Sequence, residues 1–194
     1  MSTRLPAPRR RRQLLDVALK VFADRGYHAT SMNDLAEAAG VTKPVLYQHF
    51  RSKRALYLEL LEDVGGQLRE AISKATTEAN GPREQVHEGF RAYFTFVATQ
   101  QPAFQLMFGG GARRDEEFAD AVQRVEVSVA ETIAELIVVE GLDAERRLLL
   151  AHGIVGVAEG TSRYWLAGGM TGNADELAAQ VAGLAWAGLR GVQG

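Results

Sequence analysis

The chain has 194 residues, of which 46% are hydrophobic and none is cysteine, so disulfide bridges, thiolate metal sites and cysteine nucleophiles are excluded. Its net charge of −2 is unevenly distributed, because residues 1–60 carry a balance of +6 and the remainder a balance of −8. This polarity predicts a basic N-terminal part that faces nucleic acid and an acidic body, although a solvated basic tail would give the same numbers.

No export signal, membrane span or metal site is expected. The longest mostly apolar run, residues 148–158, is about half of what a bilayer span needs. The arginine-rich start is not followed by an unbroken apolar stretch, and the four histidines are scattered. We therefore expect a cytoplasmic protein without a cofactor or a metal.

The first elements form a compact helical pattern. Residues 10–25 repeat apolar side chains at helical spacing, and Gly26 ends the helix. Thr30 or Ser31 caps a second helix, with Asp34 in the capping-box position after Ser31. The buried side of that helix is expected to consist of Leu35, Ala36, Ala38 and Ala39.

A third, short helix follows a glycine turn. Gly40 suits a turn that requires a positive φ, and Thr42 caps a helix that runs to about His49 with Pro44 in its first turn. Ser52 then caps a fourth helix whose apolar stripe continues to Ile72.

The rest of the chain keeps a helical pattern without a period-two strand. Residues 86–97 mark a helix that closes near Pro102, followed by a short apolar turn and a flexible loop of three glycines. Three further helices are expected, and they span residues 118–136, 148–166 and 173–190. The fold class predicted is all-α, with about nine helices.

The segment SMNDLAEAAGVTKPVLYQHF, residues 31–50, has the pattern of a helix-turn-helix, in which the second helix presents polar side chains to DNA. Residues 10–60 resemble the TetR family of transcriptional regulators. The positions that carry the resemblance are Phe22, Gly26, Tyr27, Thr30, Leu35, Ala36, Ala39, Gly40, Val41, Tyr47, His49, Phe50, Ser52 and Lys53. Pro44 departs from the Gly or Ala of many members and should stiffen the helix.

The resemblance implies a DNA-binding domain over residues 1–55 and a regulatory, ligand-binding and dimerisation domain over residues 56–194. It also implies a homodimer that binds a palindromic operator in double-stranded DNA. We expect such a protein to act as a repressor that a small, apolar effector releases from DNA.

The residues expected at the DNA lie in the basic N-terminal arm, around the second helix and on the third. They are Arg4, Arg9, Arg10, Arg11, Arg12, Thr30, Ser31, Thr42, Lys43, Pro44, Tyr47, Gln48, His49 and Lys53. The resemblance implies that Thr30 caps the second helix and that Lys53 contacts a phosphate. Other interpretations are that Tyr47 is packing, that His49 is structural, that Gln48 faces solvent and that the arginines form a solvated tail.

Two further sets of residues are assigned to the regulatory half. The effector pocket is expected among aromatic, Met and polar side chains, although such stripes are often ordinary core: His87, Phe90, Arg91, Phe94, Phe104, Met107, Phe108, His152, Tyr164 and Trp165. The dimer interface is expected on the last two helices, where small residues allow close approach: Gly153, Gly156, Gly160, Ala178, Ala182, Gly183, Trp186 and Leu189. The same small residues could instead serve packing within one chain.

Two other classes of function were weighed. An enzyme is disfavoured because the sequence contains no Gly-rich phosphate loop, no GxSxG elbow and no metal-ligand spacing. A non-specific architectural DNA-binding protein would be basic throughout, whereas two-thirds of this chain is acidic.

Overall fold

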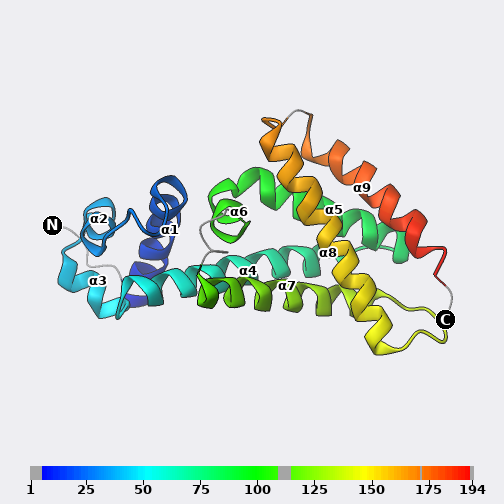
Figure 1. Cartoon of the computed structure of the whole chain (residues 1–194), viewed down its shortest axis with the longest axis horizontal. Coiled ribbons are helices and arrows are strands. Elements are labelled where there is room, and N and C mark those ends of the chain that lie inside the picture. Colours follow the sequence, from blue (N-terminus) through cyan, green and yellow to red (C-terminus); the bar gives the residue numbers. More distant parts are fainter. Residues whose placement is uncertain (1–5, 109–114, 171, 193–194) are drawn as a thin grey trace. The chain divides into compact units, whose positions relative to one another are not determined.

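The computed structural model describes residues 6–108, 115–170 and 172–192. Within these ranges the chain forms nine helices and no strand, which confirms the predicted fold class (Figure 1). The helices are α1 (Ala7–Arg25), α2 (Met32–Ala38), α3 (Lys43–His49), α4 (Lys53–Thr77), α5 (Pro82–Thr99), α6 (Gln101–Phe108), α7 (Glu116–Leu136), α8 (Ala144–Ala167) and α9 (Ala174–Leu189).

The chain divides into two compact units. The head unit comprises Met1–Val64 and Pro102–Val122, and the body unit comprises Gly65–Gln101 and Gln123–Gly194. Helices α4 and α7 therefore contribute residues to both units. The domain boundary predicted after residue 55 stays a prediction, but residues 102–122 pack with the N-terminal part of the chain.

The head unit is built around the apolar sides of its short helices. Leu14, Ala18 and Phe22 of α1 are buried, as are Leu35 of α2 and Leu46 of α3. Each lies at helical spacing from the next apolar residue of its own helix, so one face of each helix is removed from water. The expectation that Ala38 is buried was wrong, because it is exposed at the last position of α2.

Two expectations about element boundaries also need correction. Helix α1 begins at Ala7, so Arg9 to Arg12 belong to a helix and not to a flexible arm. Residues 104–108, expected as a turn, belong to the helix α6, which has Pro102 in its first turn. The glycine loop expected over residues 109–111 lies outside the described residues.

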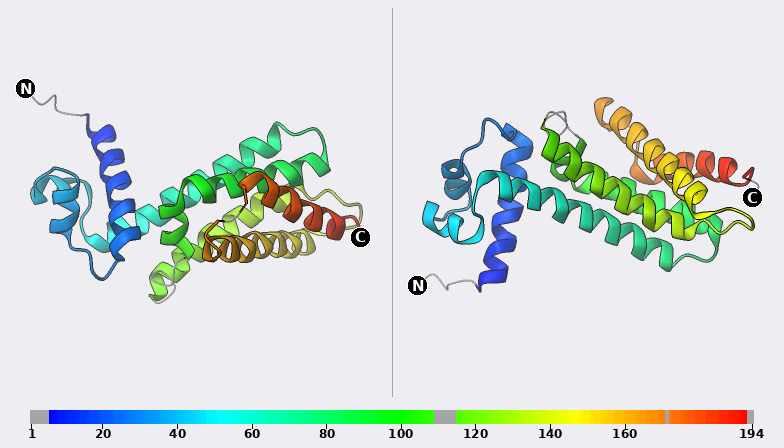
Figure 2. Two further views of the ribbon diagram at one scale, coloured as in Figure 1. Left: turned by 90° about the horizontal axis from the view of Figure 1, so that it is seen from above. Right: turned by 60° about the horizontal axis from the view of Figure 1, so that its bottom comes forward.

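The body unit is a helical bundle. Helix α9 packs along α5, and α8 packs against both of them (Figures 1 and 2). Phe94 and Val97 of α5 are fully buried there. Helices α4 and α7 approach closely at Gly65. A Cβ added there would lie 2.5 Å from the Val125 side chain. None of the helices in the described ranges has the length and apolar character needed to cross a bilayer.

Candidate nucleic-acid interface

Helix α3 has one buried side and one exposed polar side. Leu46 is only 1% exposed and Phe50, at the C-cap, only 2%. The exposed side carries Thr42, Lys43, Pro44, Tyr47 and Gln48, the residues expected to face DNA. Tyr47 is 45% exposed, which argues against a purely packing role. The exposed side can supply an ammonium, a hydroxyl and an amide to groove edges or phosphates.

The elements before α3 fix its orientation. Ser31 caps α2 through a reciprocal capping box with Asp34, and these hydrogen bonds lower the pKa of the Asp34 carboxyl. Gly40 adopts a φ of +63°, and the Val41 amide donates to the Ala36 carbonyl at 2.9 Å. The backbone thus turns sharply between α2 and α3, as a helix-turn-helix requires.

A recess of about 720 Å³ opens beside α3. It brings Arg10 of α1 together with three residues expected at the DNA, namely Thr42, Gln48 and His49. Thr42 occupies the N-cap position, but its side chain makes no capping hydrogen bond within the described part of the chain. The recess therefore combines a guanidinium, a hydroxyl and an amide on one surface.

The neighbouring Arg11 and Arg12 pair with acidic side chains of α4, whereas Arg10 donates to Gln13 of its own helix at 2.8 Å. Arg11 donates to the His49 carbonyl at 2.6 Å, pairs with Glu59 at 2.5 Å and lies over the Phe50 ring. Arg12 pairs with Asp63 of α4 at 2.7 Å. The expectation that these two arginines reach out from a flexible arm was therefore wrong.

The remaining arm residues are placed as follows. Arg9 is exposed on the first turns of α1, and Arg4 lies outside the described residues. The backbone carbonyl of His49 accepts the hydrogen bond from Arg11, and His49 itself is half-buried and lines the recess. Whether its side chain is structural or contacts DNA stays a prediction.

The side chains of Lys53 and Thr30 bind backbone carbonyls within the head unit. The Lys53 ammonium donates to the carbonyls of Tyr27 at 2.8 Å and Thr30 at 2.7 Å, and it lies over the Tyr27 ring. Burial lowers the pKa of Lys53. Thr30 is 2% exposed, and its hydroxyl donates to the Gly26 carbonyl at 2.8 Å. Ser31, not Thr30, is the cap of α2, and phosphate binding by Lys53 stays a prediction that this geometry does not favour.

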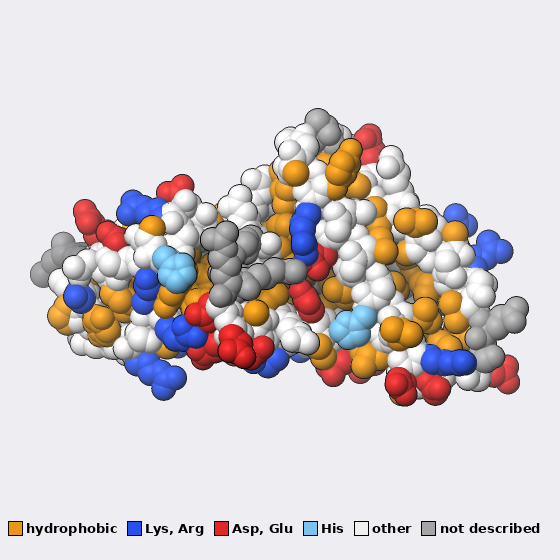
Figure 3. Space-filling view, viewed as in Figure 1, with side chains coloured by type: hydrophobic (Ala, Val, Ile, Leu, Met, Phe, Trp, Pro, Cys, Tyr) orange, Lys and Arg blue, Asp and Glu red, His pale blue; other side chains and the backbone are white. Residues whose placement is uncertain are grey.

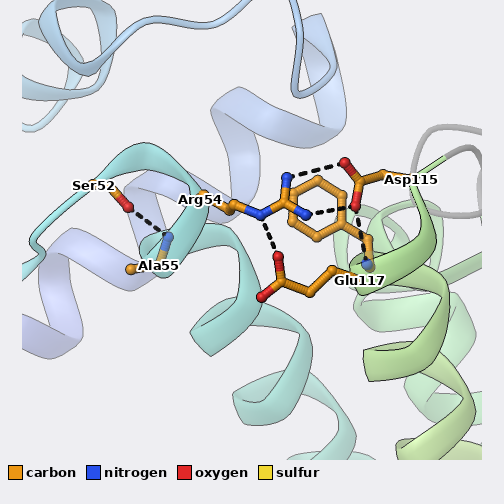
Figure 4. A network of polar contacts seen from close by, with 6 residues as sticks. Ser52, Arg54, Ala55, Asp115 and Glu117 are labelled. Carbon is orange, nitrogen blue, oxygen red and sulfur yellow. Dashed lines mark hydrogen bonds and ion pairs between the residues drawn. The ribbon is translucent and has the colours of Figure 1, made fainter.

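An ionic cluster that the sequence did not indicate lies at the start of α4 (Figure 4). Arg54 binds both carboxylate oxygens of Asp115, at 2.8 and 3.0 Å, and also pairs with Glu117. These contacts raise the pKa of Arg54 and lower that of Asp115. We call this set of three residues the Arg54 clamp. Arg54 and Asp115 are 61 positions apart in the chain, which explains why no sequence pattern predicted this contact.

The residues expected to form an effector pocket fall into three groups. Phe90, Phe94 and Trp165 are buried in the body unit, whereas Phe104, Met107 and Phe108 belong to the head unit. Phe94 contacts both Phe90 and Trp165 through its ring.

The third group lies at the surface of the body unit. Tyr164 is 84% exposed and His152 is exposed, so the expectation that these two line a pocket was wrong. His87 and Arg91 both pair with Glu88 on the surface of α5. In the described residues, no group of three His, Asp or Glu side chains is placed to hold a metal ion.

The outer faces of α8 and α9 combine small and apolar residues. Gly153, Gly156 and Gly160 of α8 and Gly183 of α9 are exposed, and a Cβ built at any of them would meet no described atom within 4 Å beyond its chain neighbours and the nearby backbone of its own helix. The same two helices carry exposed apolar side chains, namely Leu149 (70% exposed), Tyr164 and Leu184 (66%). Hydrophobic side chains gather on this surface in the space-filling view (Figure 3).

Not every residue expected at a dimer interface lies on these faces. Trp186 and Leu189 are half-buried. Ala178 and Ala182 are buried within the body unit, on the side of α9 that packs against its neighbours. Their assignment to an interface was therefore wrong, because they serve packing within one chain.

Two family models match the chain. The model described as "Bacterial regulatory proteins, tetR family" matches residues 14–60, which include all of α2 and α3. The model "Tetracyclin repressor-like, C-terminal domain" matches residues 82–188.

Similar proteins include both a transcriptional activator and a transcriptional repressor. The HTH-type transcriptional activator FasR of Mycolicibacterium smegmatis is 34% identical over 187 residues, which cover 96% of this chain and 85% of FasR. The HTH-type transcriptional repressor KstR2 of Rhodococcus jostii is 43% identical over 79 residues, 36% of this chain and 39% of KstR2.

Solved structures share the fold over nearly the whole chain. A TetR-like transcriptional regulator from Rhodococcus sp. RHA1 superposes with a TM-score of 0.78 and 31% identity, over 97% of this chain and 100% of that chain. The regulator FadR of Bacillus subtilis, solved in complex with stearoyl-CoA, has a TM-score of 0.78 at 20% identity, over 90% of this chain and 96% of that one. The second likeness shows the fold alone.

Proposed function

This chain belongs to the TetR family of bacterial transcriptional regulators, and we propose that it binds a palindromic operator as a homodimer and responds to an apolar effector. One observation carries the proposal for DNA: α3 buries Leu46 and leaves Lys43, Tyr47 and Gln48 exposed. A helix with this division of residues fits the major groove while its buried side stays anchored to the head unit.

In the proposed interface, the residues divide by the kind of contact they make. Gln48 suits a base edge, because an amide can donate and accept at adenine. Lys43, Thr42 and Tyr47 suit phosphates or base acceptors, and Arg10 suits a phosphate beside the recess. The paired side chains of Arg11 and Arg12 support α1 and α4 instead.

The proposed dimer uses the outer faces of α8 and α9. Glycines allow two helices to approach closely, and the exposed Leu149, Tyr164 and Leu184 would bury apolar area against a second copy. A dimer supplies two recognition helices. A symmetric operator offers each of them one half-site, and the two half-sites lie about 34–36 Å apart.

The proposed effector is apolar and of modest size. The support is the cluster of aromatic side chains in the body unit, together with the stearoyl-CoA complex of a protein with the same fold. The acyl chain of that ligand is apolar, whereas its coenzyme part is large and anionic, so long-chain acyl-CoA is tested beside the free long-chain fatty acid. An effector releases DNA only if it binds the DNA-free arrangement more tightly than the DNA-bound one.

The direction of regulation is a separate question. Repression is the expectation from the family resemblance, while FasR is named an activator and KstR2 a repressor. Transcription in vitro from a promoter with the operator, with and without the protein, measures the sign directly.

Selection of bound duplexes from random DNA tests the DNA proposal. A regulator of the proposed kind enriches one sequence with two-fold symmetry and protects it as a discrete footprint. Diffuse protection without enrichment would instead favour the architectural alternative. Adding long-chain acyl-CoA to the enriched complex then tests release.

A further inference from the structure

The head unit contains a segment that lies outside the helix-turn-helix in sequence. The described residues of 102–122, which include α6 and the first part of α7, pack with the described residues of 1–64 as one compact unit. The Tyr57 hydroxyl of α4 donates to the Leu106 carbonyl of α6 at 3.4 Å. The start of α7 is therefore positioned to affect how the head unit is held.

The Arg54 clamp is the polar part of this attachment (Figure 4). A guanidinium that binds both oxygens of one carboxylate fixes direction as well as distance, which a single lysine contact cannot do. The Arg54 guanidinium also lies 4.7 Å from the centre of the Phe118 ring. Charge and ring contact therefore hold the first turn of α7 against the first turn of α4.

From Phe118 the contacts continue towards α2. The Phe118 ring lies 4.8 Å from Tyr27 and 4.5 Å from Tyr57, measured between ring centres. The Tyr27 carbonyl and ring hold the Lys53 ammonium, which also binds the Thr30 carbonyl directly before the Ser31 cap. A continuous series of contacts thus joins the start of α7 to the turn that leads into the helix-turn-helix.

We propose that Arg54 is a positioning residue for DNA binding: by clamping Asp115 and Glu117, it makes the start of α7 brace the turn between α1 and α2. The inference rests on the proposed function of the head unit. Operator affinity then depends on two acidic residues that do not face DNA.

The sign of the effect separates this role from simple electrostatics. Removal of two negative charges near a DNA-binding unit strengthens binding to phosphates if only charge matters. The proposed brace predicts the opposite result, because Arg54 loses its partners and the turn loosens. Neutralising variants of the acidic pair are therefore more informative than removal of the arginine itself.

The experiment compares two double variants of the full chain on one selected operator. Asp115→Asn with Glu117→Gln removes the clamp, while Glu116→Gln with Asp120→Asn removes the same charge from exposed positions in the same part of α7. We expect the first to bind about threefold to tenfold more weakly than the wild type, and the second to bind equally or more tightly. Equal or tighter binding by the first would overturn the proposal.

A third variant separates bracing from phosphate contact. Arg54→Lys keeps the charge but cannot bind a carboxylate through two parallel N–H groups. We expect weaker operator binding with an unchanged dependence on salt concentration. Wild-type affinity for Arg54→Lys would contradict the brace.

Hydrogen exchange without DNA keeps the inference distinct from the proposed function. The brace predicts faster amide exchange over residues 26–31 in the Asp115→Asn/Glu117→Gln protein than in the Glu116→Gln/Asp120→Asn protein. Equal exchange would overturn the brace even if the wild type selects an operator. If the wild type selects no operator, the proposed function fails and the exchange result still decides whether α7 supports the turn.

Discussion

The recognition helix α3 and the outer faces of α8 and α9 are both exposed, yet they expose opposite chemistry. Helix α3 presents Lys43, Tyr47 and Gln48, whereas α8 and α9 present glycines together with Leu149, Tyr164 and Leu184. Polar groups on a short, anchored helix suit a hydrated, charged partner such as DNA. Apolar groups among glycines suit a second copy that removes them from water.

A charge placed on the apolar faces should produce the largest effect. We expect Tyr164→Glu with Leu184→Glu to yield a folded monomer, because both side chains are exposed in the single chain. Operator affinity should fall about 100-fold or more, since the two half-sites no longer bind together. Light scattering and titration of operator DNA measure the two quantities.

The control places one such charge at an exposed apolar position elsewhere. Val138 is 85% exposed in the connection between α7 and α8, so Val138→Glu should leave both the dimer and the affinity unchanged. A Tyr164→Glu/Leu184→Glu protein that stays dimeric would remove α8 and α9 from the interface.

Substitutions on α3 should separate base reading from phosphate binding. We expect Gln48→Ala to cost about 1–3 kcal/mol at its preferred base pair and to relax discrimination there, without a change in salt dependence. Lys43→Ala should weaken binding to all sequences and flatten the slope of log affinity against log salt by about one. Binding curves on operator variants at several salt concentrations distinguish these results.

Gln105→Ala serves as the control for these variants, because Gln105 is an exposed glutamine of α6. It should bind every operator variant as the wild type does. If Gln48→Ala also keeps the full base preference, α3 is not the reading element in the form proposed.

Lys53 provides a contrast with Lys43 inside the same unit. Lys53→Met removes two hydrogen bonds to carbonyls, so the free energy of unfolding should fall by about 1.5–3 kcal/mol. The salt dependence of DNA binding should remain that of the wild type. A stable Lys53→Met protein with a flattened salt slope would instead make Lys53 a phosphate contact.

The smallest expected effect is a change in the free energy of unfolding at the adjacent glycines Gly65 and Gly66 of α4, which can be compared with each other. No described atom lies within 4 Å of a Cβ at Gly66, so Gly66→Ala should stabilise the protein by up to about 1 kcal/mol. Gly65→Ala should destabilise it, because the new methyl group would meet Val125. Thermal unfolding gives both signs, and equal shifts would contradict the packing described.

Local patterns were sufficient to predict the helix-turn-helix. The capping box of Ser31 and Asp34, the glycine turn and the start of the third helix at Thr42 and Pro44 depend on residues only a few positions apart. The structure places all of these as expected.

Contacts between distant residues could not be predicted in this way. Lys53 was expected at a phosphate from the family resemblance, and its carbonyl partners lie more than 20 positions earlier in the chain, where no local pattern indicates them. Ala178 was expected at a dimer interface because small residues allow two helices to approach closely, but it is buried within one chain. The sequence alone does not distinguish a small residue that packs inside one chain from one that packs against a second copy. Only tertiary packing decides which of these roles a side chain takes.

Site-directed cleavage tests the central claim, that α3 reads DNA, most directly. The chain contains no cysteine, so Arg51→Cys, exposed just after α3, gives a single attachment point for an iron chelate that cleaves DNA. On a selected operator the labelled dimer should cut at two centres about one helical turn, ~10 base pairs, apart, each beside a major groove. Uniform cutting along the duplex, or cutting no stronger than that of free chelate, would contradict the account.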